Sequence, residues 1–207
     1  MTRRLDVYPI PGLVPELPPD GVSIAIDVIR ATTTITTALA NGAYRTLPFE
    51  TVEETFAAKR AILSEHPEEE SNVLTGGERG GIGIPGFDLS NSPSEYTADR
   101  VSGKTLLFTT TNGTKAILRC RGVSLLASFL NASAVVDRVL SEDREVVSIV
   151  CAGTNGEYTE EDLLLAGLLT DRLTLSRSDY SLNVQAEVAR ETWRMNRARP
   201  LYDLLKD

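Results

Sequence analysis

The chain has 207 residues, a formal net charge of −8 at pH 7, two cysteines and one histidine. Such an acidic chain argues against nucleic acid or an anionic membrane as a partner, because phosphate groups select for clustered Lys and Arg. No apolar run is long enough to cross a membrane, and the proline-containing N-terminus lacks the apolar core of a signal peptide. We therefore expect a cytoplasmic protein with reduced cysteines, no nucleic-acid partner and no membrane partner.

Short apolar runs alternate with helical patterns along the chain. Strands are predicted near 5–8, 22–27, 45–49, 72–75, 104–109, 122–127 and 145–151. Continuous runs of Val, Ile, Leu and Phe are typical of strands that are covered on both faces of a sheet. The pattern predicts an α/β fold with layers α/β/α around a largely parallel or mixed central sheet. We expect a single domain over 1–207, with two α/β halves that meet near 95–105.

Four helices are predicted in more detail. Thr51 and Glu54 form a capping box in front of the first. The second, over 132–140, has apolar residues at helical spacing. The third, over 160–173, begins acidic and becomes almost wholly apolar, so we expect it to be buried. The last, over 182–193, has one apolar stripe, which leaves a homo-oligomer interface and a core contact as alternatives.

Three polar loops follow directly on apolar runs, at 27–34, 109–114 and 151–156. Loops at the carboxyl ends of parallel strands lie on one edge of a sheet, where α/β proteins bind ligands. Hydroxyls, free backbone N–H groups and helix N-termini in such loops suit a small oxyanion, and Arg30 would add a fork of donors. The alternative is that one threonine caps each helix and Arg30 pairs with a surface carboxylate.

The stretch 75–93 departs from the strand–helix rhythm because it is rich in glycine. A structureless loop of this length in a compact domain is usually functional or a linker. The charged residues Glu78, Arg79 and Asp88 within it favour a functional loop.

Five carboxylates from separate loops are candidates for a Mg²⁺ site. Mg²⁺ is held by one or two carboxylates together with water and substrate phosphate oxygens. The candidates are Asp27, Glu78, Asp88, Glu161 and Asp162. For Asp162, stabilisation of a helix dipole is an equal alternative.

Two familiar phosphate-binding arrangements are absent from the sequence. Gly113-Thr114-Lys115 lacks the Walker A order Gly-Lys-Ser/Thr. Cys151 is followed by Glu157 at the position where a thiolate phosphatase would carry Arg. We expect Cys151 to be a buried, inert thiol at a strand end.

Several motifs resemble one known family in order along nearly the whole chain. They are Asp-Val-Ile-Arg-Ala-Thr-Thr at 27–33, Gly-Gly-Glu-Arg-Gly-Gly at 76–81, Gly-Phe-Asp-Leu-Ser-Asn-Ser-Pro at 86–93, Thr-Thr-Thr-Asn-Gly-Thr at 109–114, and Cys-Ala-Gly at 151–153 with Glu-Asp at 161–162. This set is similar to the 2-phosphosulfolactate phosphatase family. The resemblance implies a Mg²⁺-dependent phosphomonoester hydrolase that converts 2-phosphosulfolactate to 3-sulfolactate and phosphate, a step of coenzyme M biosynthesis.

The resemblance and the loop chemistry together give a set of expected site residues for a small anionic, phosphorylated substrate. Catalytic roles are expected for Asp27, Arg30, Glu78 and Arg79. Substrate contacts are expected from Thr32, Thr33, Asn91, Thr110, Thr111, Asn112, Gly113, Thr114 and Gly153. The expected Mg²⁺ ligands are Asp27, Glu78, Asp88 and Asp162.

Several alternatives stay open at this point. The substrate can be another small phosphorylated acid, because family resemblance fixes a site more securely than a substrate. A noncatalytic protein that binds a phosphorylated or sulfonated acid would use the same loops. Attack by water and attack by Asp27 to form an aspartyl-phosphate are both consistent with the residues. Chains of the family it resembles continue past the position of Asp207, so we expect this chain to be C-terminally truncated.

Overall fold

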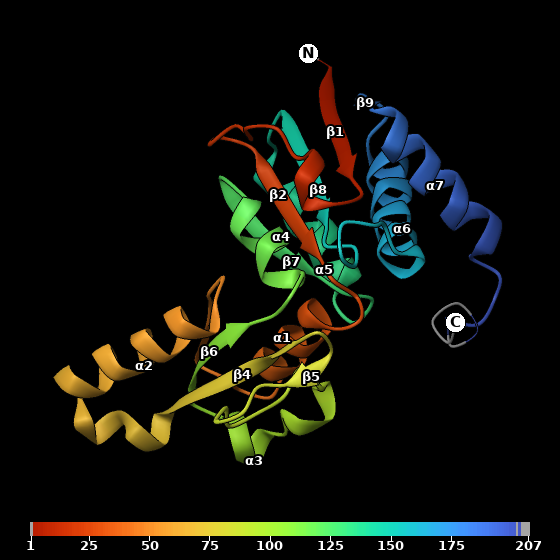
Figure 1. The fold of residues 1–207 in the computed structure, drawn as a ribbon. Helices are drawn as coiled ribbons and strands as arrows, with labels where there is room; N and C mark the ends of the chain where they lie inside the picture. Colours follow the sequence, from red (N-terminus) through yellow and green to blue (C-terminus); the bar gives the residue numbers. More distant parts are fainter. Residues whose placement is uncertain (1, 202, 204–207) are drawn as a thin grey trace.

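A computed structural model describes residues 2–201 and 203, and its strands form two separate sheets (Figure 1). The first sheet is parallel throughout, in the order β7-β2-β8-β1-β9. Its strands are β1 (Arg3–Tyr8), β2 (Val22–Ile26), β7 (Val123–Ala127), β8 (Val146–Cys151) and β9 (Tyr180–Leu182). The chain end at 204–207, to which the expected truncation refers, lies outside the described residues.

The second sheet is mixed, in the order β3-β6-β4-β5. Its strands are β3 (Arg45–Pro48), β4 (Val73–Arg79), β5 (Ile82–Gly83) and β6 (Thr105–Thr109), with β5 antiparallel to β4. The predicted layered α/β class is confirmed, with the strands divided between two sheets. The segment 45–109 supplies the whole second sheet, so residues 95–105 lie inside it.

The glycine-rich stretch is not structureless over its first part, and that expectation was wrong. Strand β4 continues through Gly76 and Gly77 to Arg79, and a tight turn leads into β5. Gly80 and Gly81 form this turn with φ of +59° and +81°, a backbone conformation that favours glycine. The glycines therefore serve a hairpin, which places Glu78 beside the turn.

The helices complete the layers. They are α1 (Ala31–Ala40), α2 (Val52–Glu65), α3 (Ala98–Val101), α4 (Gly113–Arg119), α5 (Ala132–Glu142), α6 (Glu160–Ser176) and α7 (Val184–Asn196), with 3₁₀ turns η1 (Pro11–Leu13), η2 (Pro67–Asn72) and η3 (Pro93–Glu95). The predicted capping box of α2 is present: Glu54 N donates to Thr51 Oγ1 at 3.1 Å, and Thr51 N donates to Glu54 Oε2 at 3.1 Å.

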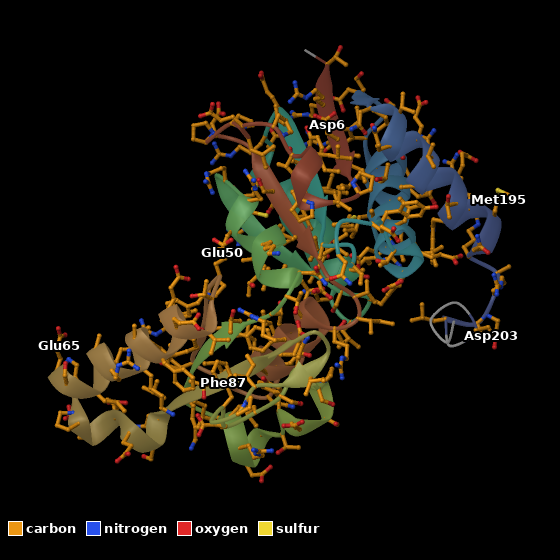
Figure 2. The ribbon with its side chains drawn as sticks, in the orientation of Figure 1. Asp6, Glu50, Glu65, Phe87, Met195 and Asp203 are labelled. Atoms are coloured by element: carbon orange, nitrogen blue, oxygen red, sulfur yellow. The ribbon has the colours of Figure 1, made fainter. Side chains whose placement is uncertain are left out.

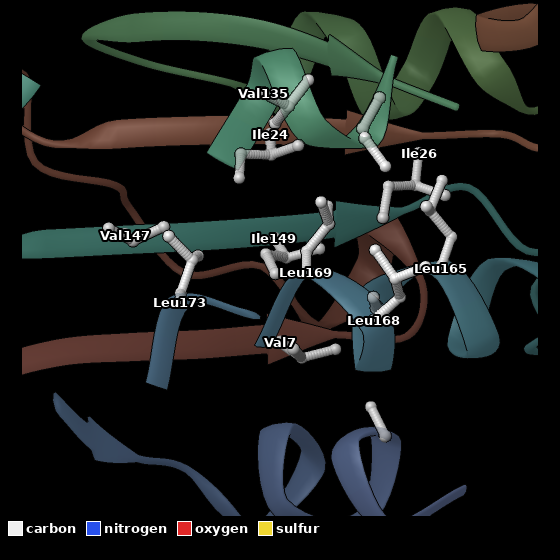
Figure 3. Packing of buried hydrophobic residues seen from close by; sticks show 14 of the residues in the cluster. Val7, Ile24, Ile26, Val135, Val147, Ile149, Leu165, Leu168, Leu169 and Leu173 are labelled. Atoms are coloured by element: carbon white, nitrogen blue, oxygen red, sulfur yellow. The ribbon is translucent and has the colours of Figure 1, made fainter. Parts of the chain in front are cut away.

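The main core lies between the first sheet and helices α5 and α6. Figure 3 shows Ile26 and Ile149 of the strands facing Leu165 and Leu169 of α6, all four fully buried. The prediction of a buried helix here is confirmed. Burial of this many aliphatic side chains, at about 25 cal/mol per Å² of apolar area, is the main term that stabilises this half of the fold.

Two helices cross from one sheet to the other. Helix α1 follows β2 of the first sheet, yet its Ile35 packs with Phe108 in the core of the second sheet. Helix α4 follows β6 of the second sheet, yet its Ala116 packs with Ala25 and Val150 of the first sheet. In Figure 1, α1 accordingly lies beside the second sheet and α4 beside the first. The two connections between the sheets, β2 to α1 and β6 to α4, therefore bring the carboxyl ends of β2 and β6 together.

Candidate functional site

The loop that leads into α1 and the start of α4 are in contact at Asp27 and Gly113. We call this contact between the two connections the joint. Asp27 follows β2 and is 8% exposed, and Gly113 is the first residue of α4. A Cβ atom at Gly113 would overlap Asp27 Oδ2 and the Cβ of Ala31, so only glycine fits here. The Ala31 N–H donates to Asp27 Oδ1 at 3.1 Å, and the Arg30 backbone N–H also interacts with this carboxylate, whereas Oδ2 accepts no hydrogen bond of ordinary geometry within the described residues. One oxygen of a buried carboxylate is thus left available at the joint.

Threonine hydroxyls fix the backbone at both crossings in the same way. Thr32 Oγ1 accepts from Asp27 N at 3.0 Å and donates to Asp27 O at 2.7 Å. Thr114 Oγ1 likewise accepts from Thr110 N at 3.3 Å and donates to Thr110 O at 2.8 Å. These hydroxyl protons are used inside the loops and are not directed at a ligand.

The other threonines of the expected substrate set are also engaged. Thr33 Oγ1 donates to Val28 O at 2.7 Å, and Thr110 Oγ1 accepts from Thr114 N at 3.1 Å. Most of the hydroxyls expected to hold substrate therefore shape the two loops that carry Asp27 and Gly113.

Glu78 joins the glycine hairpin to the loop after β6. Its Oε1 accepts from Thr111 N at 2.6 Å, and its Oε2 accepts from Gly81 N at 2.6 Å and Thr111 Oγ1 at 3.0 Å. The side chain is 7% exposed, so these bonds lie in a mostly dry environment where they are strong. Glu78 is held rigidly near Asp27, with both oxygens engaged.

Asp162 plays a matching part between the two loops of the first sheet. From the first turn of α6, its Oδ1 accepts from Val28 N at 2.8 Å and its Oδ2 accepts from Gly153 N at 3.1 Å. The carboxylate is 3% exposed. It therefore fixes the loop after β2 against the loop after β8, and Gly153 contributes its N–H to this link.

Two buried carboxylates of the site, Asp27 and Asp162, have raised pKa values. Burial is the main cause that raises the pKa of Asp27 to about 6, against the opposing hydrogen bond from Ala31. The charges of Glu78 and Glu161 raise it further. Burial, followed by the charge of Asp27, raises the pKa of Asp162 to about 7. Deprotonation of Asp27 and Asp162 therefore places negative charge in a buried site, and a bound cation would stabilise these carboxylates.

The two expected arginines differ in how free they are. Arg79 donates to Glu78 O, Glu50 O and Thr109 Oγ1 at 2.6–2.8 Å, so both of its terminal nitrogens hold backbone and loop. Arg30 is half-buried, and its guanidinium donates one long hydrogen bond, from Nη2 to Gly81 O at 3.5 Å. Of the two, Arg30 retains a guanidinium that can bind two oxygens of an anion.

Two expected residues are not brought to this joint by any contact. Asp88 Oδ2 accepts from Thr75 N, Thr75 Oγ1 and Lys59 Nζ at 2.8–2.9 Å. Burial acts to raise the pKa of Asp88, but the hydrogen bonds from Thr75 and Lys59 hold it below its usual range. Asn91 is buried against α1, where its carbonyl accepts from Thr34 Oγ1 at 3.5 Å. The structure therefore links Asp88 to the second sheet and not to Asp27.

A cavity of about 420 Å³ opens between the loops after β6 and β8. It is lined by Ile10, Pro11, Gly12, Thr111, Asn112, Lys115, Ala152, Asn155 and Gly156. Asn155 N donates to Asn112 Oδ1 at 3.3 Å, which joins the two loops across the cavity. Lys115, Asn155 and the segment 10–12 were missing from the expected set. Lys115 follows the Thr-Asn-Gly-Thr motif directly, whereas nothing in the sequence connects 10–12 with these loops.

The fit of a Mg²⁺ ion can be tested against these oxygens. Within residues 2–201 and 203, no three His, Cys, Asp or Glu side chains form a group that could hold a metal ion. Both oxygens of Glu78 and of Asp162 are occupied by N–H groups. Asp27 Oδ2 and the half-buried Glu161 remain available. The residues fit an ion held by one or two carboxylates and completed by water and phosphate oxygens.

No helix in the part of the chain that the structure describes has the length and apolar character needed to span a membrane. Fold and site together define an α/β protein with a buried acidic joint between two sheets, beside the cavity between the loops after β6 and β8. The chain belongs to the 2-phosphosulpholactate phosphatase family, whose sequence profile matches residues 8–207.

Relatives with curated names agree with this family. A protein of Thermotoga petrophila, named probable 2-phosphosulfolactate phosphatase, is 47% identical over 152 residues, which are 73% of this chain and 62% of that protein. A Symbiobacterium thermophilum protein of the same name is 45% identical over 186 residues, 89% of this chain and 76% of that protein. This chain thus spans 62% of the length of the Thermotoga relative.

Proposed function

We propose that this chain is a Mg²⁺-dependent phosphatase that hydrolyses 2-phosphosulfolactate to 3-sulfolactate and phosphate. The observation that carries the proposal is the buried carboxylate of Asp27, with one oxygen available where the strand ends of both sheets meet. The family to which the chain belongs supports this reaction and substrate.

In this proposal, Asp27 is the main ligand of Mg²⁺, with Glu161 as a second carboxylate near it. The ion, when bound, neutralises charge on the phosphoryl oxygens and on nearby carboxylates. Arg30 binds the phosphoryl group through its fork of N–H donors. Glu78 and Asp162 act as positioning residues, because they hold the loops that carry Arg30, Thr111 and Gly153 in place.

The chemical step transfers the phosphoryl group to water. A bond forms between the water oxygen and phosphorus, and the ester bond from phosphorus to the C2 oxygen breaks. The attacking water gives up one proton and the leaving alkoxide takes up one, so the products are 3-sulfolactate and hydrogen phosphate. The variant in which Asp27 attacks first would leave an aspartyl-phosphate on the protein. Rapid-quench trapping with labelled substrate separates the two: labelled protein supports attack by Asp27, and its absence supports direct attack by water.

The first experiment is phosphate release from racemic 2-phosphosulfolactate, with 2-phospholactate and p-nitrophenyl phosphate alongside, each with Mg²⁺ and with EDTA. Turnover that requires Mg²⁺ and prefers the sulfonated substrate supports the proposal. Turnover of 2-phospholactate but not of 2-phosphosulfolactate would show that the substrate is another small phosphorylated acid. A folded sample that binds these acids without releasing phosphate would contradict a catalytic role.

The proposal also places the protein in the cytoplasm, in the synthesis of coenzyme M, to which 3-sulfolactate leads. Cys120 and Cys151 are both free and buried, as expected for a reducing compartment. Burial raises the pKa of the Cys151 thiol well above its ordinary value, which fits an inert core residue and no nucleophile.

A further inference from the structure

A second cavity, of about 430 Å³, lies on the other side of Lys115. Its lining residues are Pro11, Gly12, Glu50, Lys115, Leu118, Arg119 and Arg121. Pro11, Gly12 and Lys115 also line the cavity between the loops after β6 and β8, so the two cavities adjoin. We call the second one the α4 cavity, since most of its charged lining comes from α4 and the two residues after it.

Three cations face the α4 cavity in a chain whose net charge is −8. Lys115 and Arg119 are exposed, and their side chains make no hydrogen bond or ion pair with any residue that the structure describes. Arg121 Nη1 donates to Leu118 O at 3.0 Å and to Cys120 O at 2.8 Å. These bonds fix the guanidinium of Arg121 and leave the rest of its donors available.

The one carboxylate of the α4 cavity does not neutralise this group. Glu50 lies just before α2, beside the end of α4 (Figure 2), and its side chain forms no ion pair among residues 2–201 and 203. Three cations that line one cavity repel one another, and an anion bound between them offsets that repulsion. Two guanidinium groups and one ammonium match a tetrahedral oxyanion, because each Arg can bind two of its oxygens.

We propose that the α4 cavity is a second anion-binding site, which takes a small molecule with a phosphate or sulfonate group. It uses none of Asp27, Arg30 or Glu78 and stands independently of the proposed reaction. Because Lys115 borders both cavities, an anion bound in the α4 cavity competes for this ammonium group with a ligand in the neighbouring one.

The test is a titration of the ¹⁵N-labelled full chain in EDTA, followed by amide NMR spectra. Inorganic phosphate is the first probe and methanesulfonate the second, with NaCl at equal ionic strength as a reference. We expect saturable shifts at Gly12, Arg119 and Arg121. Arg119→Ser should weaken binding roughly tenfold, because it removes charged hydrogen bonds. Arg60→Ser on α2, which also removes an exposed arginine, should leave binding unchanged.

The titrations distinguish a specific anion site from a general effect of ionic strength. Saturable shifts with phosphate alone identify a phosphate site, and shifts with methanesulfonate extend it to sulfonates; both support the inference. Shifts that NaCl reproduces, or equal affinity in wild type, Arg119→Ser and Lys115→Met, overturn it. The Asp27→Asn variant should lose phosphate release yet keep these shifts. A chain with no phosphatase activity would therefore leave this test intact.

Discussion

At the scale of single residues, the central feature is a carboxylate that is kept in a place unfavourable for its charge. Asp27 is 8% exposed and lies near Glu78 and Glu161, and its pKa is raised to about 6. The folded state therefore binds more protons than the unfolded state between about pH 4 and pH 6. Stability contributed by protonated Asp27 is present at low pH and is lost as the pH rises through about 6.

The Asp27→Asn variant should not lose stability as the pH rises through about 6, because an amide does not ionise. The amide oxygen can still accept from Ala31 N, and the amide group takes the place of the unbonded Oδ2. In EDTA at pH 8 we expect the free energy of unfolding to rise by up to about 3 kcal/mol. Near pH 4 the difference should vanish, while phosphate release is lost at every pH. Urea unfolding at both pH values measures this, and a variant less stable at pH 8 would contradict it.

Gly113 is the second residue on which the joint depends. Gly113→Ala places a methyl group against Asp27 Oδ2 and Ala31, so one of the two crossings must move. We expect a loss of about 1–3 kcal/mol in stability, together with a loss of activity. Gly83→Ala is the matched control, since a Cβ there meets only Ser90 at an ordinary 3.5 Å. Equal effects of the two substitutions in urea unfolding would exclude this account.

At the scale of elements, the hydroxyl of Thr32 joins β2 to α1. Its Oγ1 both accepts from and donates to the backbone of Asp27, with the side chain fully buried. Valine has nearly the same shape but no hydroxyl. Thr32→Val therefore removes the acceptor of the buried Asp27 N–H and one of two donors to Asp27 O, which keeps the backbone N–H of residue 32 as its other donor. We expect the free energy of unfolding to fall by about 1–3 kcal/mol.

A second threonine of α1, Thr36, has a hydroxyl that makes no such hydrogen bond within the described residues. Thr36 Oγ1 is buried and has no hydrogen-bond partner in the described part of the chain. Thr36→Val should therefore be neutral or slightly stabilising, because it removes an unsatisfied polar atom. Thermal or urea unfolding of both variants compares them directly. A larger loss from Thr36→Val than from Thr32→Val would show that the hydroxyl of Thr32 does not hold the crossing.

At the scale of the whole molecule, α1 and α4 connect the two sheets by packing on the sheet that they do not follow. Each sheet thus has a buried cluster that includes a helix following a strand of the other sheet, so we expect both sheets to unfold in one transition. Trp193, the one tryptophan of the chain, packs against the core of the first sheet. Its fluorescence and the far-UV circular dichroism should give the same urea midpoint.

A substitution in the second core sharpens this prediction. Phe108→Leu lies in the second sheet and should lower the midpoint reported by Trp193, at a cost of about 1 kcal/mol. Ile82→Ala, at a side chain 75% exposed on β5, should leave it unchanged. Two separate transitions, or a Trp193 signal insensitive to Phe108→Leu, would show that the sheets unfold independently.

Local patterns in the chain were enough to predict most helices and strands and the polar character of the loops. Apolar runs predicted seven strands near their observed positions, and the Thr51 capping box marked the start of α2, because hydrogen bonding and side-chain periodicity act over a few residues. The order of the motifs was enough to indicate the family that the chain joins.

The way in which these elements pack together could be seen only in the folded chain. Two sheets in place of one, the crossing of α1 and α4, and the pairing of Asp88 with Lys59 depend on contacts between segments far apart in the chain. Local patterns carry no information on such contacts. Burial and donor geometry then separated carboxylates that look alike in sequence. Glu78 and Asp162 have both oxygens engaged in the loops, whereas Asp27 retains one for a ligand.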